Sequence, residues 1–191
     1  MRFTLYGTAL TPGSQFYVWG RQAEQDSSAT SYIPTTATAV IRISDDLSFL
    51  SGAALSEMQS SNGTFAVETN NLRGGAYSKI ISNSSSGLLE EGENASRIGS
   101  IGNGGPYFLA DLGTGTLSTG SVKSAVSWSA STRALVGNGG SVATSTGTMA
   151  VRDAIYIGSK AKLGNYIEGH VKSFKFYPLT ATNTQLQLMT Q

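Results

Sequence analysis

The stretch Val122–Thr144 reads VKSAVSW SAS TRALVG NGG SVAT, and it decides the fold class. Its first seven residues alternate in the two-residue period of a β-strand that has one face on a core. The face expected to be buried consists of Val122, Val126 and Trp128, and the wetter face consists of Lys123, Ala125 and Ser127.

The rest of this stretch predicts a hairpin. Arg133–Gly137 meets Ser141–Thr144 through Asn138-Gly139. Asn-Gly accepts the positive φ angles of a type I′ turn, which suits the twist of two antiparallel strands.

The same pattern extends along the chain, where short apolar or alternating segments recur every ten to fifteen residues between Gly, Ser, Asn or Pro. This spacing favours an all-β, antiparallel sandwich or barrel over a fold of alternating strands and helices. The further strands are expected at Phe3–Tyr6, Gln15–Trp19, Val40–Ile43, Gly63–Thr69, Lys79–Ser82, Arg97–Ile101, Tyr107–Asp111, Ala154–Ile157 and Ile167–Tyr177.

Two features near the C-terminus add detail. Val171 and Phe174 have opposite parity in the last strand, so a bulge or bend is expected between them. After that strand, Thr182–Met189 is the only expected helix, of one or two turns, with Thr182 or Asn183 as its N-cap.

Composition bounds the function. The 191 residues suit one domain with a short appendage, and the formal net charge of +1, without a basic block, argues against a nucleic-acid partner. No apolar run reaches the length of a membrane span, and no cysteine is present for disulfides or thiolate metal sites. We expect residues 1–36 to form an N-terminal hairpin arm and linker, and residues 37–191 to form the core domain.

Catalytic motifs are absent, so we expect no enzyme. His170 is the only histidine, there is no Gly-x-Ser-x-Gly, and His170 is expected to be a solvent-facing strand residue. The paired acids of a β-sandwich glycosidase are missing: Asp45-Asp46 are adjacent, and Glu90–Glu93 is expected to be a solvated loop tip. A hydrolase built from acids on distant strands is the distant alternative.

No cofactor is expected, with calcium as the alternative. Asp111, Asp153 and Asn165 are oxygen donors on expected loops that could gather at one edge of a sandwich, although these residue types are more often turn formers.

Several segments resemble known proteins. Tyr17–Glu24 and Ala29–Thr36 resemble a connector of bacteriophage tail and virion structural proteins. Gly63–Glu68, Lys123–Trp128 and Ile155–Ser159 resemble strands of concanavalin A-like or laminin-G-like domains. The order of the matching pieces runs from Trp19 to Met189. The resemblance implies a two-layer concanavalin A-like jelly roll on a phage particle, with other virion proteins as partners and a homo-oligomer, guessed to be a trimer.

It also implies that host-surface carbohydrate is a ligand, bound through loops or the concave face. Aromatic and amide side chains near the Gly-rich turns are the candidate contacts, and loop packing is the alternative for each. These candidates are Tyr107, Asn103, Tyr166 and Asn165, then Tyr77 and Arg73. A virion protein with a purely structural role and no glycan ligand is the competing hypothesis. Trp128 and Phe174 are expected in the core instead.

Overall fold

The computed structural model describes residues 47–191, except 74–77, 85–86, 92–96, 101, 104–106, 113–119, 151 and 160–166. The described residues fall within one compact unit, Asp45–Gln191. The arm expected at residues 1–36 and its boundary with the core domain lie outside the described residues and stay predictions.

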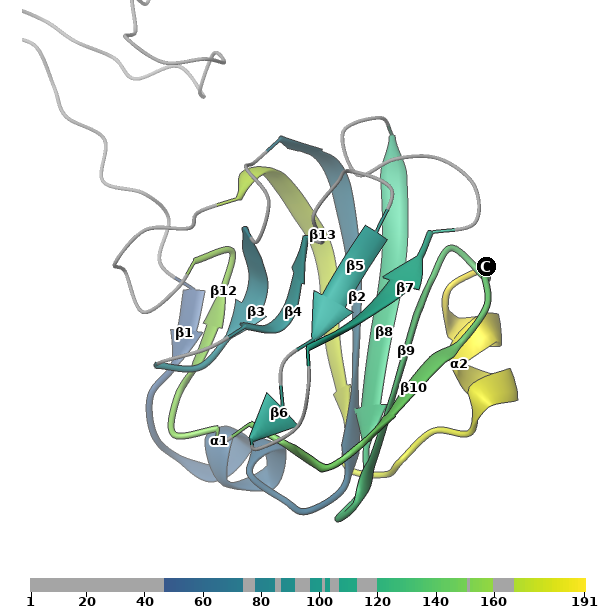
Figure 1. Cartoon of the computed structure of the whole chain (residues 1–191). Helices are drawn as coiled ribbons and strands as arrows, with labels where there is room; N and C mark the ends of the chain where they lie inside the picture. The colour runs from purple at the N-terminus through teal and green to yellow at the C-terminus, as the bar shows by residue number, and fades with distance from the viewer. Residues whose placement is uncertain are drawn as a thin grey trace, which may run out of the picture. The chain divides into compact units, whose positions relative to one another are not determined.

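The described chain is a two-layer antiparallel β-sandwich, which confirms the predicted fold class (Figure 1). One sheet has the order β1-β12-β3-β4-β5-β7, the other β10-β9-β8-β2-β13, and β6 pairs with β11. The first sheet comprises β1 (Leu47–Phe49), β3 (Lys79–Ser82), β4 (Gly87–Glu91), β5 (Arg97–Ser100), β7 (Phe108–Asp111) and β12 (Ile155–Ile157). The second comprises β2 (Gly63–Arg73), β8 (Ser121–Trp128), β9 (Thr132–Gly137), β10 (Ala143–Thr146) and β13 (Glu168–Tyr177), and the short pair is β6 (Gly102–Asn103) and β11 (Thr148–Met149).

Aromatic rings fill one end of the space between the two sheets. The ring of Phe65, on β2, lies 4.9 Å from that of Trp128 and 5.5 Å from those of Phe174 and Phe176. Phe49, on β1 of the other sheet, reaches Phe174 at 6.0 Å. Trp128 is buried and Phe174 packs against the same core, as predicted.

The predicted type I′ hairpin is confirmed. Asn138 and Gly139 have φ angles of 47° and 65°, and the Gly140 amide donates to the Gly137 carbonyl at 2.9 Å. The ladder between β9 and β10, in which Leu135 faces Ala143, lies one residue off the register that a two-residue turn alone would set, so one extra residue is accommodated between the turn and β10. The two residues at the tip therefore predict the turn, and the register of the strands also depends on the residues that follow it.

The irregularity predicted in the last strand is also confirmed. The register of β13 against β2 shifts between Val171 and Ser173. Because of this shift, Val171 packs against the same core as Phe174 and Phe176 despite their opposite parity.

The C-terminal helix α2 (Asn183–Met189) begins where predicted. Thr182 is its N-cap, and a capping box forms: the Gln185 amide donates to Thr182 Oγ1 at 3.3 Å, and the Thr182 amide donates to Gln185 Oε1 at 2.9 Å.

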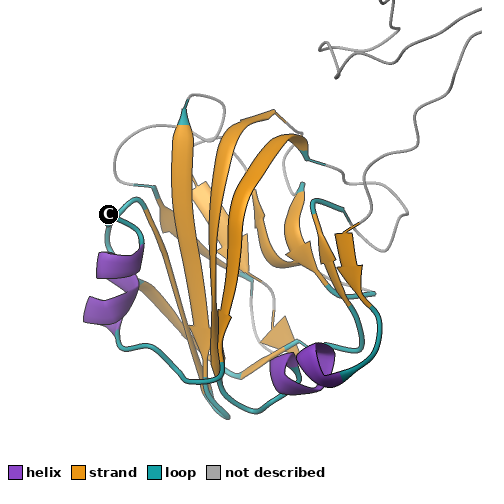
Figure 2. Cartoon of the chain, turned by 180° about the vertical axis from the view of Figure 1, so that it is seen from behind, coloured by secondary structure: helices purple, strands orange, loops and turns teal. Residues whose placement is uncertain are grey.

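The prediction of a wetter face on β8 was wrong for two of its three residues. Ala125 and Ser127 are almost completely buried. Leu186 of α2 is buried in a second apolar cluster with Ala125, on the outer side of the five-stranded sheet (Figure 2). Helix α2 therefore buries the outer face of β8, and the alternation of residues within β8 does not predict this contact.

Two further predictions were wrong. A second helix, α1 (Ala53–Met58), packs Leu55 and Met58 into the core, although its N-cap Gly52 offers no capping side chain. Glu90–Glu93 was expected to be a solvated loop tip, but Glu90 and Glu91 belong to strand β4 and pair with β5, while Gly92 and Glu93 lie outside the described residues. Tertiary packing decides both elements.

Candidate functional site

The candidate site lies on the outer face of the six-stranded sheet, at β5 and β7. Ile98 and Ala110 of these strands point into the core. The alternate positions therefore face outward. We call this set the Tyr107 surface, and it consists of Arg97, Gly99, Tyr107, Leu109 and Asp111.

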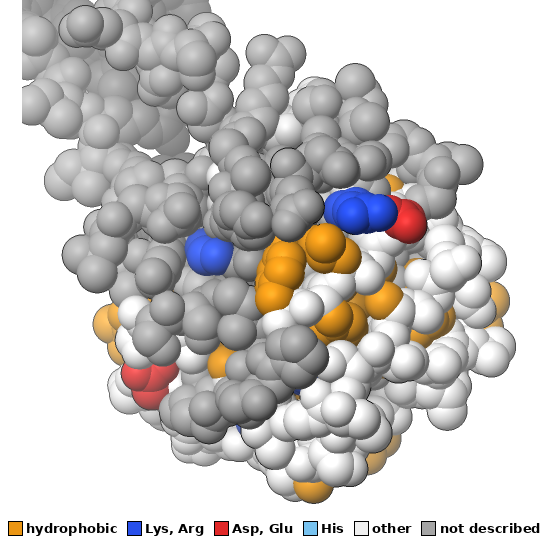
Figure 3. Space-filling model, viewed as in Figure 1, with side chains coloured by type: hydrophobic (Ala, Val, Ile, Leu, Met, Phe, Trp, Pro, Cys, Tyr) orange, Lys and Arg blue, Asp and Glu red, His pale blue; other side chains and the backbone are white. Residues whose placement is uncertain are grey.

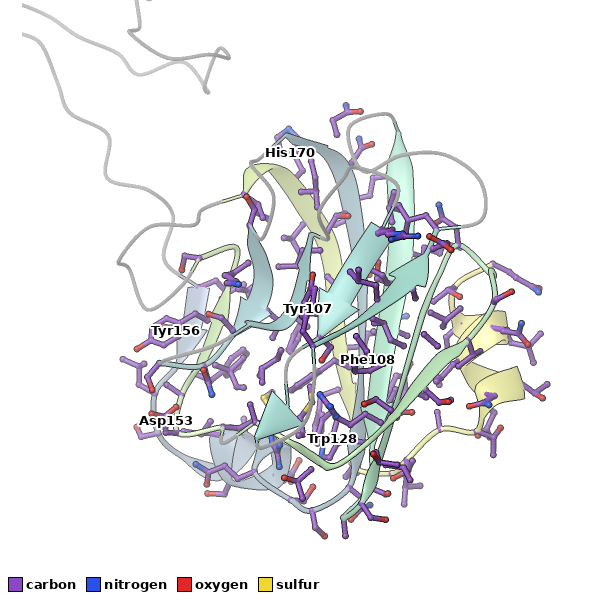
Figure 4. All side chains as sticks on the ribbon, in the orientation of Figure 1. Tyr107, Phe108, Trp128, Asp153, Tyr156 and His170 are labelled. Atoms are coloured by element: carbon purple, nitrogen blue, oxygen red, sulfur yellow. The ribbon has the colours of Figure 1, made fainter. Side chains whose placement is uncertain are left out.

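Tyr107 lies directly before β7, and its ring rests on Gly99 of β5 (Figure 4). A Cβ atom at position 99 would lie 2.2 Å from the Tyr107 hydroxyl oxygen and 2.5 Å from Cζ. The hydroxyl is buried, while the residue as a whole is partly exposed. Glycine is thus the residue that allows the ring to lie against the sheet.

We expect Gly99→Ala to lower the free energy of unfolding by about 1–3 kcal/mol, because the new methyl group collides with the tyrosine ring. Alanine in a strand is otherwise favoured over glycine. The measurement is urea unfolding of both proteins. The same substitution in a Tyr107→Ala background should be tolerated, and an equal loss there would contradict the contact.

An ion pair borders the ring on the same face. Arg97 Nε donates to Asp111 Oδ1 at 2.7 Å, across the pair of residues that face each other in β5 and β7. The side chains are 40% and 71% exposed, so the pair adds little to stability. A guanidinium and a carboxylate in this position give a ligand both donors and acceptors.

The space-filling view agrees with this layout. Hydrophobic side chains gather near the middle of the viewed face, with Lys or Arg and Asp or Glu side chains beside them (Figure 3). Leu109, which faces Gly99 across the strands, is also partly exposed. The surface thus combines an apolar centre with a polar border.

Among the described residues of this sheet, Tyr156 is a second aromatic residue on the outer face, and sequence reasoning did not single it out. It lies on β12 between the buried Ile155 and Ile157, so its ring faces outward (Figure 4). The Ile-Tyr-Ile alternation was the signal that would have found it. Three strand spacings, about 14 Å, separate β12 from β5.

Of the six predicted site residues, the structure assigns Tyr107 to this surface. Asn103 lies in β6, where it pairs with Thr148 of β11, and Arg73 ends β2 opposite Glu168. Tyr77, Asn165 and Tyr166 lie outside the described residues. The prediction that these residues share a ligand therefore stays a prediction.

The two described calcium candidates lie apart. Asp153 precedes β12 and Asp111 ends β7, with three strands of the sheet between them. Asp153 accepts hydrogen bonds from the Ser84 hydroxyl and amide and from the Ala154 amide, and these bonds hold the pKa of its carboxyl below the usual range. Within the described part of the chain, no three His, Cys, Asp or Glu residues form a group that suits a metal ion. Asn165 lies outside it.

His170 is exposed on β13, opposite Asn70, as predicted (Figure 4). Neither helix among the described residues has the length and apolar character of a membrane span.

Comparison with known proteins supports the fold. No protein-family model and no curated protein matches the sequence. The carbohydrate-binding module CBM40 of Ruminococcus gnavus IT-sialidase has a TM-score of 0.52 and 16% identity, covering 72% of this chain and 86% of that one. The same module bound to α2,3-sialyllactose has a TM-score of 0.51 and 16% identity, covering 69% of this chain and 83% of that one. Leech intramolecular trans-sialidase has a TM-score of 0.55 and 15% identity, covering 76% of this chain and 26% of that one. The chain thus has the lectin-like jelly-roll fold of these domains.

Proposed function

We propose that this protein binds glycans without cleaving them, and that the Tyr107 surface is its binding site. The observation that carries the proposal is the tyrosine ring held against Gly99, with Leu109 and the exposed Arg97–Asp111 pair beside it.

The chemistry of this surface matches that of a sugar. A pyranose offers an apolar C–H face and a fringe of hydroxyl groups, and an aromatic ring beside charged or amide groups complements both. Tyr107 supplies the ring, and Arg97 and Asp111 supply a donor and an acceptor within the same pair of strands.

The structural neighbours favour the same ligand class. The Ruminococcus gnavus module is a carbohydrate-binding domain that was solved with α2,3- and α2,6-sialyllactose. Its resemblance to this chain extends over most of both domains. We therefore take sialylated and neutral oligosaccharides as the first ligands to test.

We further propose that this binding serves the attachment of a bacteriophage particle to its host. The phage-like connector at Tyr17–Glu24 and Ala29–Thr36 supports this context. In a virion, many copies of a weak site act together, so a modest affinity for each copy suffices. The proposed location is the particle surface, in a homo-oligomer beside other virion proteins, with a trimer as the first oligomer to test.

We expect Tyr107→Ala to weaken glycan binding at least about tenfold, because the sugar loses its stacking partner. Tyr107→Phe keeps the ring and should retain binding. The measurement is a glycan array with the protein displayed in many copies, followed by titration of α2,3-sialyllactose, α2,6-sialyllactose and lactose.

The matched control is Tyr177→Ala. Tyr177 is 37% exposed and ends β13 in the other sheet, so its removal should leave binding unchanged. If the folded wild-type protein binds no glycan on the array, the proposal fails and the purely structural virion role is favoured. If Tyr107→Ala and Tyr177→Ala bind as the wild type does, the site lies elsewhere.

A further inference from the structure

A hollow of about 380 Å³ lies on the outer side of the five-stranded sheet, beside the segment that leads into α2 (this side faces the viewer in Figure 2). Three neighbouring strands and this segment line it, and apart from Arg133 and Asn183 the lining side chains are small. The lining residues are Ser127, Thr132, Arg133, Ala134, Thr144, Ser145, Thr146, Thr180, Ala181 and Asn183.

Among the most buried side chains of the hollow is that of Ser127, which carries a hydroxyl group. Ser127 is only 1% exposed and Ala134 8%. The Ser127 hydroxyl makes no hydrogen bond with the described residues, and Ser127 lines the hollow. This hydroxyl is therefore ready to bond to a group that enters the hollow.

The sides of the hollow carry further hydroxyl and amide groups that can form hydrogen bonds. Thr144 and Thr146 alternate along β10 on one side, and Asn183 lies on the other. These side chains make no hydrogen bond with the described part of the chain. Threonine has few χ1 rotamers, so its hydroxyl on a strand loses little freedom when it binds a ligand.

The hollow has no charged group directed into it. Arg133 contributes to the lining, but its guanidinium turns to the inner side of the sheet, where Cζ lies 4.8 Å from the centre of the Phe108 ring. There Nη2 donates to Ser145 Oγ at 3.2 Å. A charged ligand would gain no partner in the hollow.

We propose that this hollow is a second ligand site that takes one or two rings of a neutral saccharide. Hydroxyl groups that each donate and accept a hydrogen bond match the hydroxyls of a sugar, and the methyl groups of Ala134 and Ala181 contact its C–H groups. Its volume lies near the lower end of the range of about 300–1,000 Å³ for small-molecule sites, which suits a mono- or disaccharide. This inference does not depend on the Tyr107 surface, which belongs to the other sheet.

The test follows the backbone amides of Thr144, Thr146, Ala181 and Asn183 by NMR while glucose, N-acetylglucosamine, lactose, maltose or cellobiose is added. We expect saturable shifts of these amides with at least one sugar at concentrations up to about 10 mM, the range of weak single sites. The double variant Thr144→Val/Thr146→Val keeps the shape and should raise the dissociation constant at least about fivefold through the lost hydrogen bonds.

Thr184→Val, at an exposed position of α2 whose side chain does not line the hollow, is the matched control and should bind as the wild type does. Tyr107→Ala should leave these shifts intact, so failure of the Tyr107 site and failure of this site are read separately. The inference is overturned if none of the five sugars shifts the four amides, or if the double variant binds as tightly as the wild type.

Discussion

Replacing Trp128 with alanine is expected to lower the free energy of unfolding by about 3–5 kcal/mol, the cost of removing a large buried ring. Trp128 is 1% exposed, and its ring centre lies 4.9 Å from that of Phe65 and 6.2 Å from that of Phe176. Its indole nitrogen also donates to the Ser60 carbonyl at 3.2 Å. Urea unfolding followed by far-ultraviolet circular dichroism measures the loss.

Trp128→Phe separates packing from hydrogen bonding and keeps the experiment informative if the alanine variant does not fold. Phenylalanine retains most of the ring volume but cannot donate to Ser60, so the expected loss is about 1–2 kcal/mol. A loss of under 1 kcal/mol in Trp128→Ala would show that this ring is not the centre of the aromatic core.

The sequence predicted this part of the fold because local signals and tertiary contacts agree there. The alternation in Val122–Trp128 matches the buried face of β8, and Asn138-Gly139 matches the turn that follows β9. The capping residues of α2 lie next to the helix they start. Such elements can be predicted from sequence because the residues that determine them are neighbours in the chain.

The elements that sequence reasoning missed depend on distant residues. Strand β4 offers one buried pair, Leu88 and Leu89, and becomes a strand because β3 and β5 pair with both its edges. The outer face of β8 is covered by Leu186, about sixty residues later. No local pattern in either segment shows what will lie against it.

For the candidate site, the sequence likewise indicated the residue with a local signal but not the residues that contact it. Tyr107 could be chosen as an aromatic residue beside a Gly-rich turn, but its neighbours follow from strand register. Gly99 and Leu109 meet because β5 and β7 pair in this register, and the same pairing brings Arg97 to Asp111. Their spacing in the sequence does not reveal either contact.

Removing the guanidinium of Arg152 is the second change with a large expected effect. Arg152 is 8% exposed, and burial lowers the pKa of its guanidinium from the usual value. Its nitrogens donate to four carbonyls: Met58 at 2.5 Å, Ala150 at 3.0 Å, Gln59 at 3.1 Å and Ser60 at 2.6 Å. Three of these carbonyls belong to the end of α1 and the turn after it, where helical carbonyls lack partners.

We expect Arg152→Met to lower the free energy of unfolding by roughly 3–5 kcal/mol, because each buried carbonyl left without a donor costs about 1–3 kcal/mol and part of that is recovered by water. Arg152→Lys keeps the charge but replaces the planar fork with a single ammonium group, so an intermediate loss is expected. The measurement is urea unfolding of each variant. Equal stability of Arg152→Met and the wild type would show that α1 holds its place through Leu55 and Met58 alone.

Arg152 and Trp128 should not act independently. The guanidinium carbon lies 4.9 Å from the centre of the indole ring, and both side chains donate to the carbonyl of Ser60. Each single change removes the contact between guanidinium and ring, whereas the Ser60 carbonyl keeps one donor until both side chains are changed, so the two losses should not add. A cycle built from Arg152→Lys and Trp128→Phe, the milder pair, should give a coupling of about 0.5–3 kcal/mol. Losses that add within about 0.3 kcal/mol would mean that helix α1 and the aromatic core are stabilised separately.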